Sequence, residues 1–215
     1  MRAAWLFLLL PSLSVVAQVN LIPADDFAWV NLSEVLPNIC IELRYAGASN
    51  IVHRPIYAAQ TPALLRAGVA RKVSAAETIL RRYNYNLKIW DAYRPSQAQA
   101  ELWKLVRNDN YVADPAAGSG SLHSWGVAID ATIVDNWGRN VPMPTDFDDF
   151  TPAAMLRYTG SDPVVRAHLY LLQKAMAYAD FYGLRTEWWH FTSSDWKRYL
   201  PPEVAKPKGN TALSP

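Results

Sequence analysis

The order of helical and extended patterns constrains the fold of this chain more than any other feature of its sequence. Residues 61–83, "TPALLRAGVARKVSAAETILRRY", predict a long helix, with Thr61 as the N-cap and Pro62 at the first helical position. The stretch "NLKIWDAYRP" predicts a short buried strand that ends before Pro95, because the residue before a proline avoids helical backbone angles. A long helix is therefore followed closely by a buried strand.

A second helix is expected directly after that strand, over 96–108, "SQAQAELWKLVRN". Ser96 and Gln99 have the spacing of a capping box, in which side chains bind free backbone amides at the start of a helix. Arg94 is thereby placed at the junction between a strand and a helix. The following residues, 108–120, end in a glycine-rich run and predict a loop.

The second half of the chain begins with an expected hairpin. "GVAIDATIV" (126–134) predicts a strand, "DNWGRN" a turn, and the residues through 143 a second extended stretch. A helix is predicted over 161–184, with Asp162 and Pro163 at its start and Gly183 at its end. The last predicted strand is "RTEWWHF", residues 185–191.

This irregular alternation favours an α+β fold, with helices packed on a mainly antiparallel sheet, over a parallel doubly wound sheet. No repeat or long linker interrupts residues 20–200, so we expect one domain. Cys40 is the only cysteine, which excludes an intramolecular disulfide, and we expect it to be a buried small hydrophobe. With 215 residues, 51% of them hydrophobic, the chain is long enough to stabilise itself through a core.

The charged residues are scattered and their formal sum is only +2. No basic block is present that would attract a phosphate backbone or an anionic membrane. Nucleic acid is therefore not an expected partner.

The N-terminal sequence "MRAAWLFLLLPSLSVVAQVN" has the features of an export signal. One arginine precedes an apolar run that ends in Val15-Val16-Ala17, where a signal peptidase could cut. At about 14 residues, the run is shorter than the ~20 needed for a membrane-spanning helix. We expect a signal peptide at 1–17, a mature domain at 18–205 without a stable membrane span, a loose tail at 206–215, and export, to the bacterial periplasm. An uncleaved membrane anchor is the alternative.

Two short segments collect side chains that bind metals: His123 with Asp130, and Glu187 with His190. Two imidazoles, one carboxylate and a water make a catalytic zinc site with one open position, and the remaining acid is then free to take a proton from the water. The spacings of seven and three residues place the members of each pair on opposite faces of a regular strand. Gly126 can supply the irregularity in the first segment, and the second needs a bulge or a Glu187 that approaches from the side.

Each residue also has a structural interpretation that the spacing alone leaves open. A single histidine beside a strand is usually a core or surface residue, and Glu187 next to Arg185 can be half of an ion pair. Of the four histidines, His53 and His168 belong to neither segment, and we expect both to be structural. We expect Trp188 and Trp189 to alternate, one in the core and one lining the cleft.

Several motifs together resemble the D-alanyl-D-alanine dipeptidases, zinc peptidases of the vancomycin-resistance type. "SLHSWGVAID" is similar to Ser-x-His-x-x-Gly-x-Ala-x-Asp and "EWWH" to Glu-x-Trp-His, and the order and separation agree. "WDAYRP", "VPMPTDFDDF" and "ELRYAGASNIVHRPIY" extend the resemblance over about residues 30–200.

The resemblance implies one zinc ion per chain, held by His123, Asp130 and His190, with Glu187 as the general base and acid. It further implies that Arg94 stabilises the developing oxyanion, that Asp148 lies near the free ammonium of the substrate, and that Ser121 is a further substrate contact. For these last three residues, an ion pair, a solvated loop acid and a turn-forming serine are the respective alternatives.

The expected activity is zinc-dependent hydrolysis of the dipeptide D-Ala-D-Ala in cell-wall peptide turnover. The first alternative is a D,D-carboxypeptidase that removes terminal D-Ala from peptidoglycan stem peptides, and the second is a zinc-binding module without activity. Glu187 and Arg94 disfavour the inactive module. Resistance-associated relatives act in the cytoplasm, so an export signal points instead to scavenging of dipeptide released from the cell wall.

Overall fold

A mixed five-stranded sheet forms the centre of the protein, seen here in a computed structural model that describes residues 21–200. Strand β2 runs parallel to β4, and every other neighbouring pair in the sheet is antiparallel. The expected α+β class with a mainly antiparallel sheet is therefore confirmed, with one parallel pair at the edge. In spatial order the strands are β2 (Cys40–Ile41), β4 (Tyr85–Asp91), β5 (Ala128–Asp135), β7 (Glu187–Ser193) and β6 (Phe181–Leu184).

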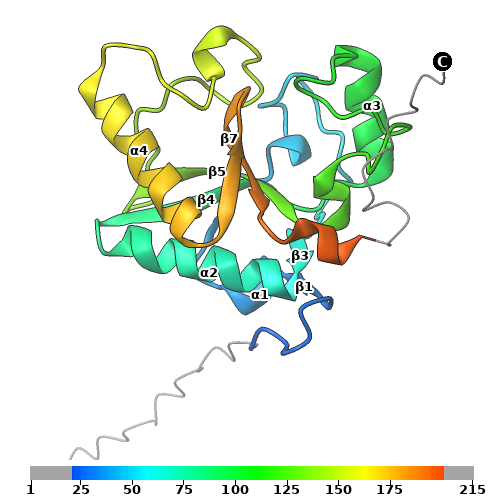
Figure 1. Cartoon of the computed structure of the whole chain (residues 1–215), viewed down its shortest axis with the longest axis horizontal. Coiled ribbons are helices and arrows are strands. Elements are labelled where there is room, and N and C mark those ends of the chain that lie inside the picture. The colour runs from blue at the N-terminus through cyan, green and yellow to red at the C-terminus, as the bar shows by residue number, and fades with distance from the viewer. Residues whose placement is uncertain (1–20, 201–215) are drawn as a thin grey trace, which may run out of the picture.

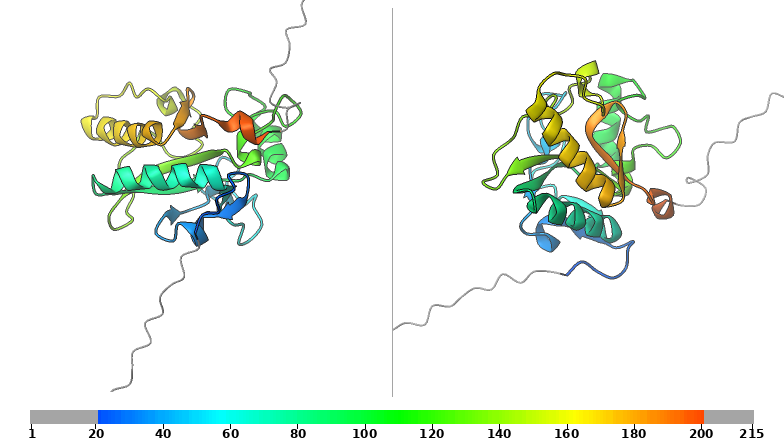
Figure 2. Two further views of the ribbon diagram at one scale, coloured as in Figure 1. Left: turned by 60° about the horizontal axis from the view of Figure 1, so that its bottom comes forward. Right: turned by 60° about the vertical axis from the view of Figure 1, so that its left-hand side comes forward.

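Two long helices, α2 (Ala67–Arg81) and α4 (Pro163–Tyr178), lie side by side against the sheet (Figures 1 and 2). Their apolar residues recur at helical spacing and join those of β4 and β5 in one hydrophobic core. The predicted start of α4 is confirmed, because the Asp162 carboxylate accepts hydrogen bonds from the amides of Val164 and Val165.

The first long helix begins later than predicted, because a short strand occupies the start of the predicted helical segment. Residues Leu64–Arg66 form β3, which pairs with β1 (Trp29–Asn31) in a separate two-stranded sheet, and α2 begins only at Ala67. The Thr61 hydroxyl donates to the carbonyl of Ala58 and caps no helix. A single-turn helix, α1 (Leu32–Val35), continues from β1.

Helix α3 (Ser96–Val106) follows β4 as predicted, but the capping box does not form. Pro95 occupies the N-cap position and no side chain caps the helix. The side-chain amide of Gln99 instead accepts a hydrogen bond from Arg94 and donates one to the Ala113 carbonyl. Short 3-10 turns complete the chain: η1 (Arg44–Ala46), η2 (Leu122–Trp125), η3 (Pro152–Ala154) and η4 (Trp196–Tyr199).

Two predictions for the second half of the chain require correction. The expected hairpin is reduced to a single bridge between Val134 and Asn140, and the sheet partners of β5 are instead β4 and, at Ala128–Asp130, β7. Helix α4 ends at Tyr178 rather than at Gly183, since Phe181–Leu184 is needed as strand β6 beside β7.

The predicted signal peptide at 1–17 and tail at 206–215 lie outside the described residues, as do the domain limits 18 and 205. Between residues 21 and 200, none of the helices combines the length and apolarity required to cross a bilayer. Cys40 lies in β2 and is only partly buried.

Candidate active site

The paired strands β5 and β7 place two of the predicted metal ligands next to each other. Asp130 lies directly opposite His190 in the antiparallel register, so their side chains point to the same face of the sheet. Their neighbours Ile129 and Phe191 point to the opposite face and belong to the hydrophobic core. The alternation of a strand thus presents a carboxylate and an imidazole on one surface.

His123 reaches this surface from the 3-10 turn η2, which ends at Gly126. The glycine has a φ of +70°, in the left-handed region that favours glycine, and it separates the turn from β5. A Cβ at this position would lie 2.4 Å from Cζ3 of Trp29. Gly126 therefore supplies the irregularity that the odd spacing of His123 and Asp130 requires, as predicted.

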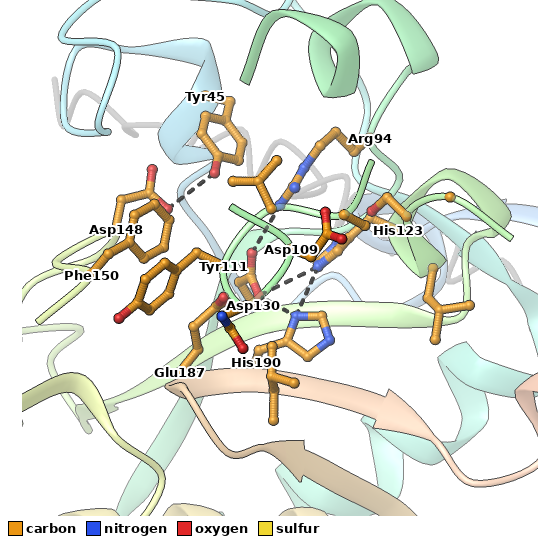
Figure 3. A pocket seen from close by; sticks show the side chains of 17 residues that line it. Tyr45, Arg94, Asp109, Tyr111, His123, Asp130, Asp148, Phe150, Glu187 and His190 are labelled. Carbon is orange, nitrogen blue, oxygen red and sulfur yellow. Dashed lines mark hydrogen bonds and ion pairs between the residues drawn. The ribbon is translucent and has the colours of Figure 1, made fainter. Parts of the chain in front are cut away.

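The three side chains converge on one point (Figure 3). Nδ1 of His190 lies 3.0 Å from Oδ1 of Asp130 and 3.1 Å from Nε2 of His123, and the latter atom is 3.4 Å from the same carboxylate oxygen. One donor atom from each residue thus lies within 4.8 Å of the others. Two imidazole nitrogens and a carboxylate oxygen are a ligand set that suits zinc with an open position.

The outer nitrogen of each imidazole is already engaged. Nδ1 of His123 lies 2.9 Å from the Ala92 carbonyl, and Nε2 of His190 lies 3.1 Å from the Thr192 hydroxyl. A ring that donates its outer N–H to an oxygen turns the lone pair of its other nitrogen toward the cluster. Both rings are thereby oriented as metal ligands commonly are.

Glu187, the first residue of β7, lies beside this cluster in the same cavity (Figure 3). Its Oε1 is buried and has no hydrogen-bond partner among the described residues. Burial, and then the charges of Asp130 and Asp148, hold the pKa of its carboxyl well above the ordinary value. The β6–β7 register shifts at the end of β6, between Gly183 and Leu184, which is the irregularity predicted for this segment.

Arg94 lies just beyond β4, at the predicted junction, and forms ion pairs with two carboxylates. The Asp91 Oδ2 lies 2.9 Å from its Nε and 2.8 Å from its Nη2, and the Asp130 Oδ2 lies 3.3 Å from Nη2. Asp91 is fully buried and also accepts a 2.5 Å hydrogen bond from the hydroxyl of Tyr57. Sequence reasoning missed Asp91, although an acid inside the buried strand of "WDAYRP" was a signal for it.

Asp148 and Ser121 line the cavity away from the cluster's centre. The Asp148 carboxylate accepts hydrogen bonds of 3.1 Å from the Tyr45 hydroxyl and from the Ile51 amide. Burial raises the pKa of Asp148 to about 7, against the lowering effect of the Ile51 amide and Arg94. The structure therefore brings all seven predicted site residues to one cavity.

The cavity has a volume of about 190 Å³, and part of its lining was not predicted. Residues Asp109–Ala113, here called the wall segment, come from the loop after α3 and line the cavity. The Tyr111 ring stacks on Phe150, with centroids 4.8 Å apart. Besides the seven predicted residues and the wall segment, the lining comprises Tyr45, Gly120, Leu122, Phe150 and Leu184.

The prediction that one tryptophan of "EWWH" lines the cleft is wrong. Trp188 and Trp189 are both fully buried and neither borders the cavity, because other aromatic rings pack against both. His53 is exposed, and His168 lies between Tyr85 and the Pro142 carbonyl. Neither histidine reaches the site.

A triad of metal-binding atoms, a buried carboxyl with an unpartnered oxygen and a fixed guanidinium in one small cavity define the site of a metal-dependent hydrolase. A family model described as D-ala-D-ala dipeptidase (Peptidase_M15) matches residues 25–205. The chain belongs to this peptidase family, and the predicted family is confirmed.

Named relatives agree with this assignment. The chain is 35% identical over 168 residues to the D-alanyl-D-alanine dipeptidase of Escherichia coli (strain K12), a match that covers 78% of this chain and 86% of the relative. It is 23% identical over 182 residues to the enzyme of the same name from Enterococcus faecalis, which covers 76% and 90%. A solved vancomycin-resistance D,D-pentapeptidase in complex with Zn(II) matches with a TM-score of 0.40 and 12% identity over 81% of this chain and 90% of that one.

Proposed function

We propose that the protein hydrolyses D-alanyl-D-alanine to two molecules of D-alanine, using one zinc ion held by His123, Asp130 and His190. The observation that carries the proposal is the convergence of these three donors beside the buried Glu187 carboxyl. The names of the relatives supply the dipeptide as the substrate. A zinc ion at this position supplies a Lewis acid that polarises the substrate carbonyl and makes a bound water more acidic.

Glu187 is the proton carrier of the proposed reaction. Its carboxylate takes a proton from the attacking water and passes it to the nitrogen of the leaving D-alanine. A general base works best with a pKa near the working pH, and burial moves the pKa of Glu187 upward in that direction. The absence of a hydrogen-bond partner at Oε1 among the described residues leaves this oxygen free for the proton.

Arg94 provides the charge that the developing oxyanion requires. Asp91 holds its Nε and Nη2 on one edge, so the guanidinium is fixed before the substrate arrives. A donor that is already in place costs no reorganisation during the reaction, and one such donor typically contributes about 2.7–4 kcal/mol.

The substrate termini are assigned to Asp148 and Ser121. The Asp148 carboxylate is a partner for the free ammonium of the dipeptide, and the Ser121 hydroxyl is a further polar contact. The cavity of about 190 Å³ is smaller than the roughly 300–1,000 Å³ of sites for drug-sized ligands. This size favours a dipeptide over the longer stem peptides of a D,D-carboxypeptidase.

We infer from the sequence of residues 1–17 that the chain is exported, to the bacterial periplasm, and recovers dipeptide from cell-wall turnover. Fractionation of cells that express the full chain tests this inference. Activity in the periplasmic fraction, with the N-terminal segment removed, supports export. Activity confined to the cytosol with residues 1–17 intact contradicts it.

The activity itself is tested on purified protein by metal analysis together with release of D-alanine from D-Ala-D-Ala. We expect one zinc ion per chain, loss of activity on chelation, and recovery on addition of zinc. A pentapeptide stem serves as the competing substrate. Cleavage of the stem with the dipeptide left intact would assign the chain to the D,D-carboxypeptidases instead.

A further inference from the structure

Gln99 connects the guanidinium of Arg94 to the wall segment, Asp109–Ala113. Its Oε1 accepts a 3.0 Å hydrogen bond from Nη1 of Arg94, and its Nε2 donates a 2.6 Å hydrogen bond to the Ala113 carbonyl. The side chain is only 2% exposed and does not line the cavity. Because a reversed amide would oppose two donors and two acceptors, these partners fix its orientation.

The contact with Gln99 completes the support of Arg94. Asp91 and Asp130 bind the Nε and Nη2 atoms, whereas Nη1 has Gln99 as its hydrogen-bond partner among the described residues. Unlike Asp91 and Asp130, Gln99 carries no charge. It therefore fixes the rotation of the guanidinium plane without adding a further negative charge to the site.

Thr186 makes a second connection to the wall segment, from the residue that precedes β7. Its hydroxyl donates a 2.7 Å hydrogen bond to the Asn110 carbonyl, and its side chain is 4% exposed. Thr186 immediately precedes Glu187, so this bond joins the wall segment to the backbone that carries the proposed base. Figure 3 shows the Tyr111 ring of the wall segment beside Phe150, on which it stacks.

The two hydrogen bonds have the same arrangement, and neither belongs to a helix or a sheet. Each comes from a buried neutral side chain, ends on a carbonyl of the wall segment, and starts beside a charged group of the site. A buried carbonyl that loses its donor bears a desolvation cost, so the wall segment is held at both ends.

We propose that Gln99 and Thr186 are positioning residues that clamp the wall segment, through Ala113 and Asn110, in register with Arg94 and Glu187. This inference rests on the proposed function for its kinetic consequences. The cavity keeps its width only while both hydrogen bonds hold, so a substrate is aligned with the guanidinium and the carboxyl together. A misplacement of about 1 Å can cost roughly a hundredfold in rate.

Two pairs of variants test the clamp. Gln99→Met removes both bonds, and we expect kcat to fall about tenfold with a rise in KM. Gln99→Glu keeps an acceptor for Arg94 but adds a negative charge and opposes the Ala113 carbonyl, so kcat recovers only in part while KM stays high. Thr186→Val raises KM about fivefold, and Thr186→Ser, which keeps the hydroxyl, restores it. Thr78→Val is the matched control, because the Thr78 hydroxyl also donates to a carbonyl, that of Ser74, but on the exposed face of helix α2.

Hydrogen exchange of the Tyr111 and Val112 amides provides a second measurement that needs no substrate. Both amides bond to the Asn108 carbonyl, and we expect them to exchange faster in Gln99→Met and Thr186→Val than in the wild type or Thr78→Val. Unchanged exchange and unchanged kcat and KM in both variants would overturn the clamp. If the two amides exchange faster in the variants as expected, but the wild type leaves D-Ala-D-Ala intact, the proposed function is overturned and the clamp is retained.

Discussion

The two faces of strand β5 are equally buried and serve opposite purposes. Ile129 and Ile133 are 0% exposed on the face that joins the hydrophobic core, while Asp130 and Thr132 are 1% and 2% exposed on the other. The apolar side chains need only close packing. Asp130 is tolerated because Arg94 and the two imidazoles surround its carboxylate.

This difference teaches that burial alone does not separate scaffold from site in this protein. The core face gains stability from every atom that it excludes from water. The site face carries the cost of burying Asp130 and Glu187, and burial by itself raises the pKa of both carboxyls. The contacts with His123 and His190 nevertheless bring the pKa of Asp130 below its ordinary value, whereas the pKa of Glu187 stays well above. Substitutions on the two faces should therefore separate stability from activity.

The largest expected effect is on the site face. Glu187→Gln removes the proposed proton carrier and should lower kcat by about 10²- to 10⁴-fold while zinc content stays at the wild-type level. The melting temperature should not fall, since a neutral amide is buried at lower cost than a carboxylate. Turnover of D-Ala-D-Ala with parallel metal analysis measures both, and a fully active, zinc-loaded variant would remove Glu187 from the mechanism.

Ile133→Ala sharpens the comparison from the core face. The cavity left beside Leu87 should lower the free energy of unfolding by about 2–5 kcal/mol, measured by denaturant titration. Turnover per folded molecule should remain that of the wild type. A variant that is stable yet inactive would show that the two faces are not independent.

Arg94→Lys tests whether charge alone is sufficient at the oxyanion position. Lysine keeps the charge but cannot bind Asp91 and Gln99 at once through a planar fork, so we expect kcat to fall by about 10²- to 10³-fold. Arg139→Lys, in the exposed turn after β5, is the control with unchanged kinetics. Equal rates for Arg94→Lys and the wild type would assign Arg94 to an ordinary ion pair.

The smallest effect is the pH dependence set by Asp148. With a pKa of about 7, its carboxyl is neutral at lower pH and binds the substrate ammonium poorly, so KM should fall as the pH rises through 7, by up to about tenfold per unit. Asp148→Asn should raise KM and flatten this profile. An unchanged profile in the variant would assign the titration to another group.

The raised pKa of Asp148 also makes the stability of the protein depend on pH. A rise in pH that improves substrate binding lowers stability. The folded protein retains a proton that the unfolded chain releases near the ordinary value of 3.8, so this contribution to stability is lost progressively as the pH rises from 3.8 to about 7. Thermal unfolding should therefore show that Asp148→Asn gains on the wild type at pH values above about 7.

Local signals in the sequence predicted those parts of the fold that depend on near neighbours. Asp162 and Pro163 mark the start of α4, and Pro95 marks the boundary after β4. Strands β3 and β6 were missed because their partners are set by the fold: Leu64–Arg66 pairs with Trp29–Asn31, and β6 is stable only beside β7. Helix-forming residues around β3 favoured the wrong state, since non-local pairing overrides local propensity.

Those residues of the candidate site that form short sequence motifs could be predicted. The structure brings the two halves of the proposed ligand set, one on either side of α4 in the chain, into contact. Their roles as ligands, base and oxyanion donor remain predictions that the experiments above test. Asp91, Gln99 and the wall segment were missed because their importance lies in partners that are remote in sequence or presented by backbone carbonyls.

Gly126 shows how far the site depends on strand β1. The Trp29 indole fills the space where a side chain at 126 would lie, and Arg66 of the neighbouring strand donates its amide to the Gly126 carbonyl. The first strand thus acts as a buttress for the bend that carries His123. Trimming of the N-terminus that removes Trp29 would loosen the imidazole of His123, which lies far along the chain. We expect metal affinity to fall before the core is destabilised.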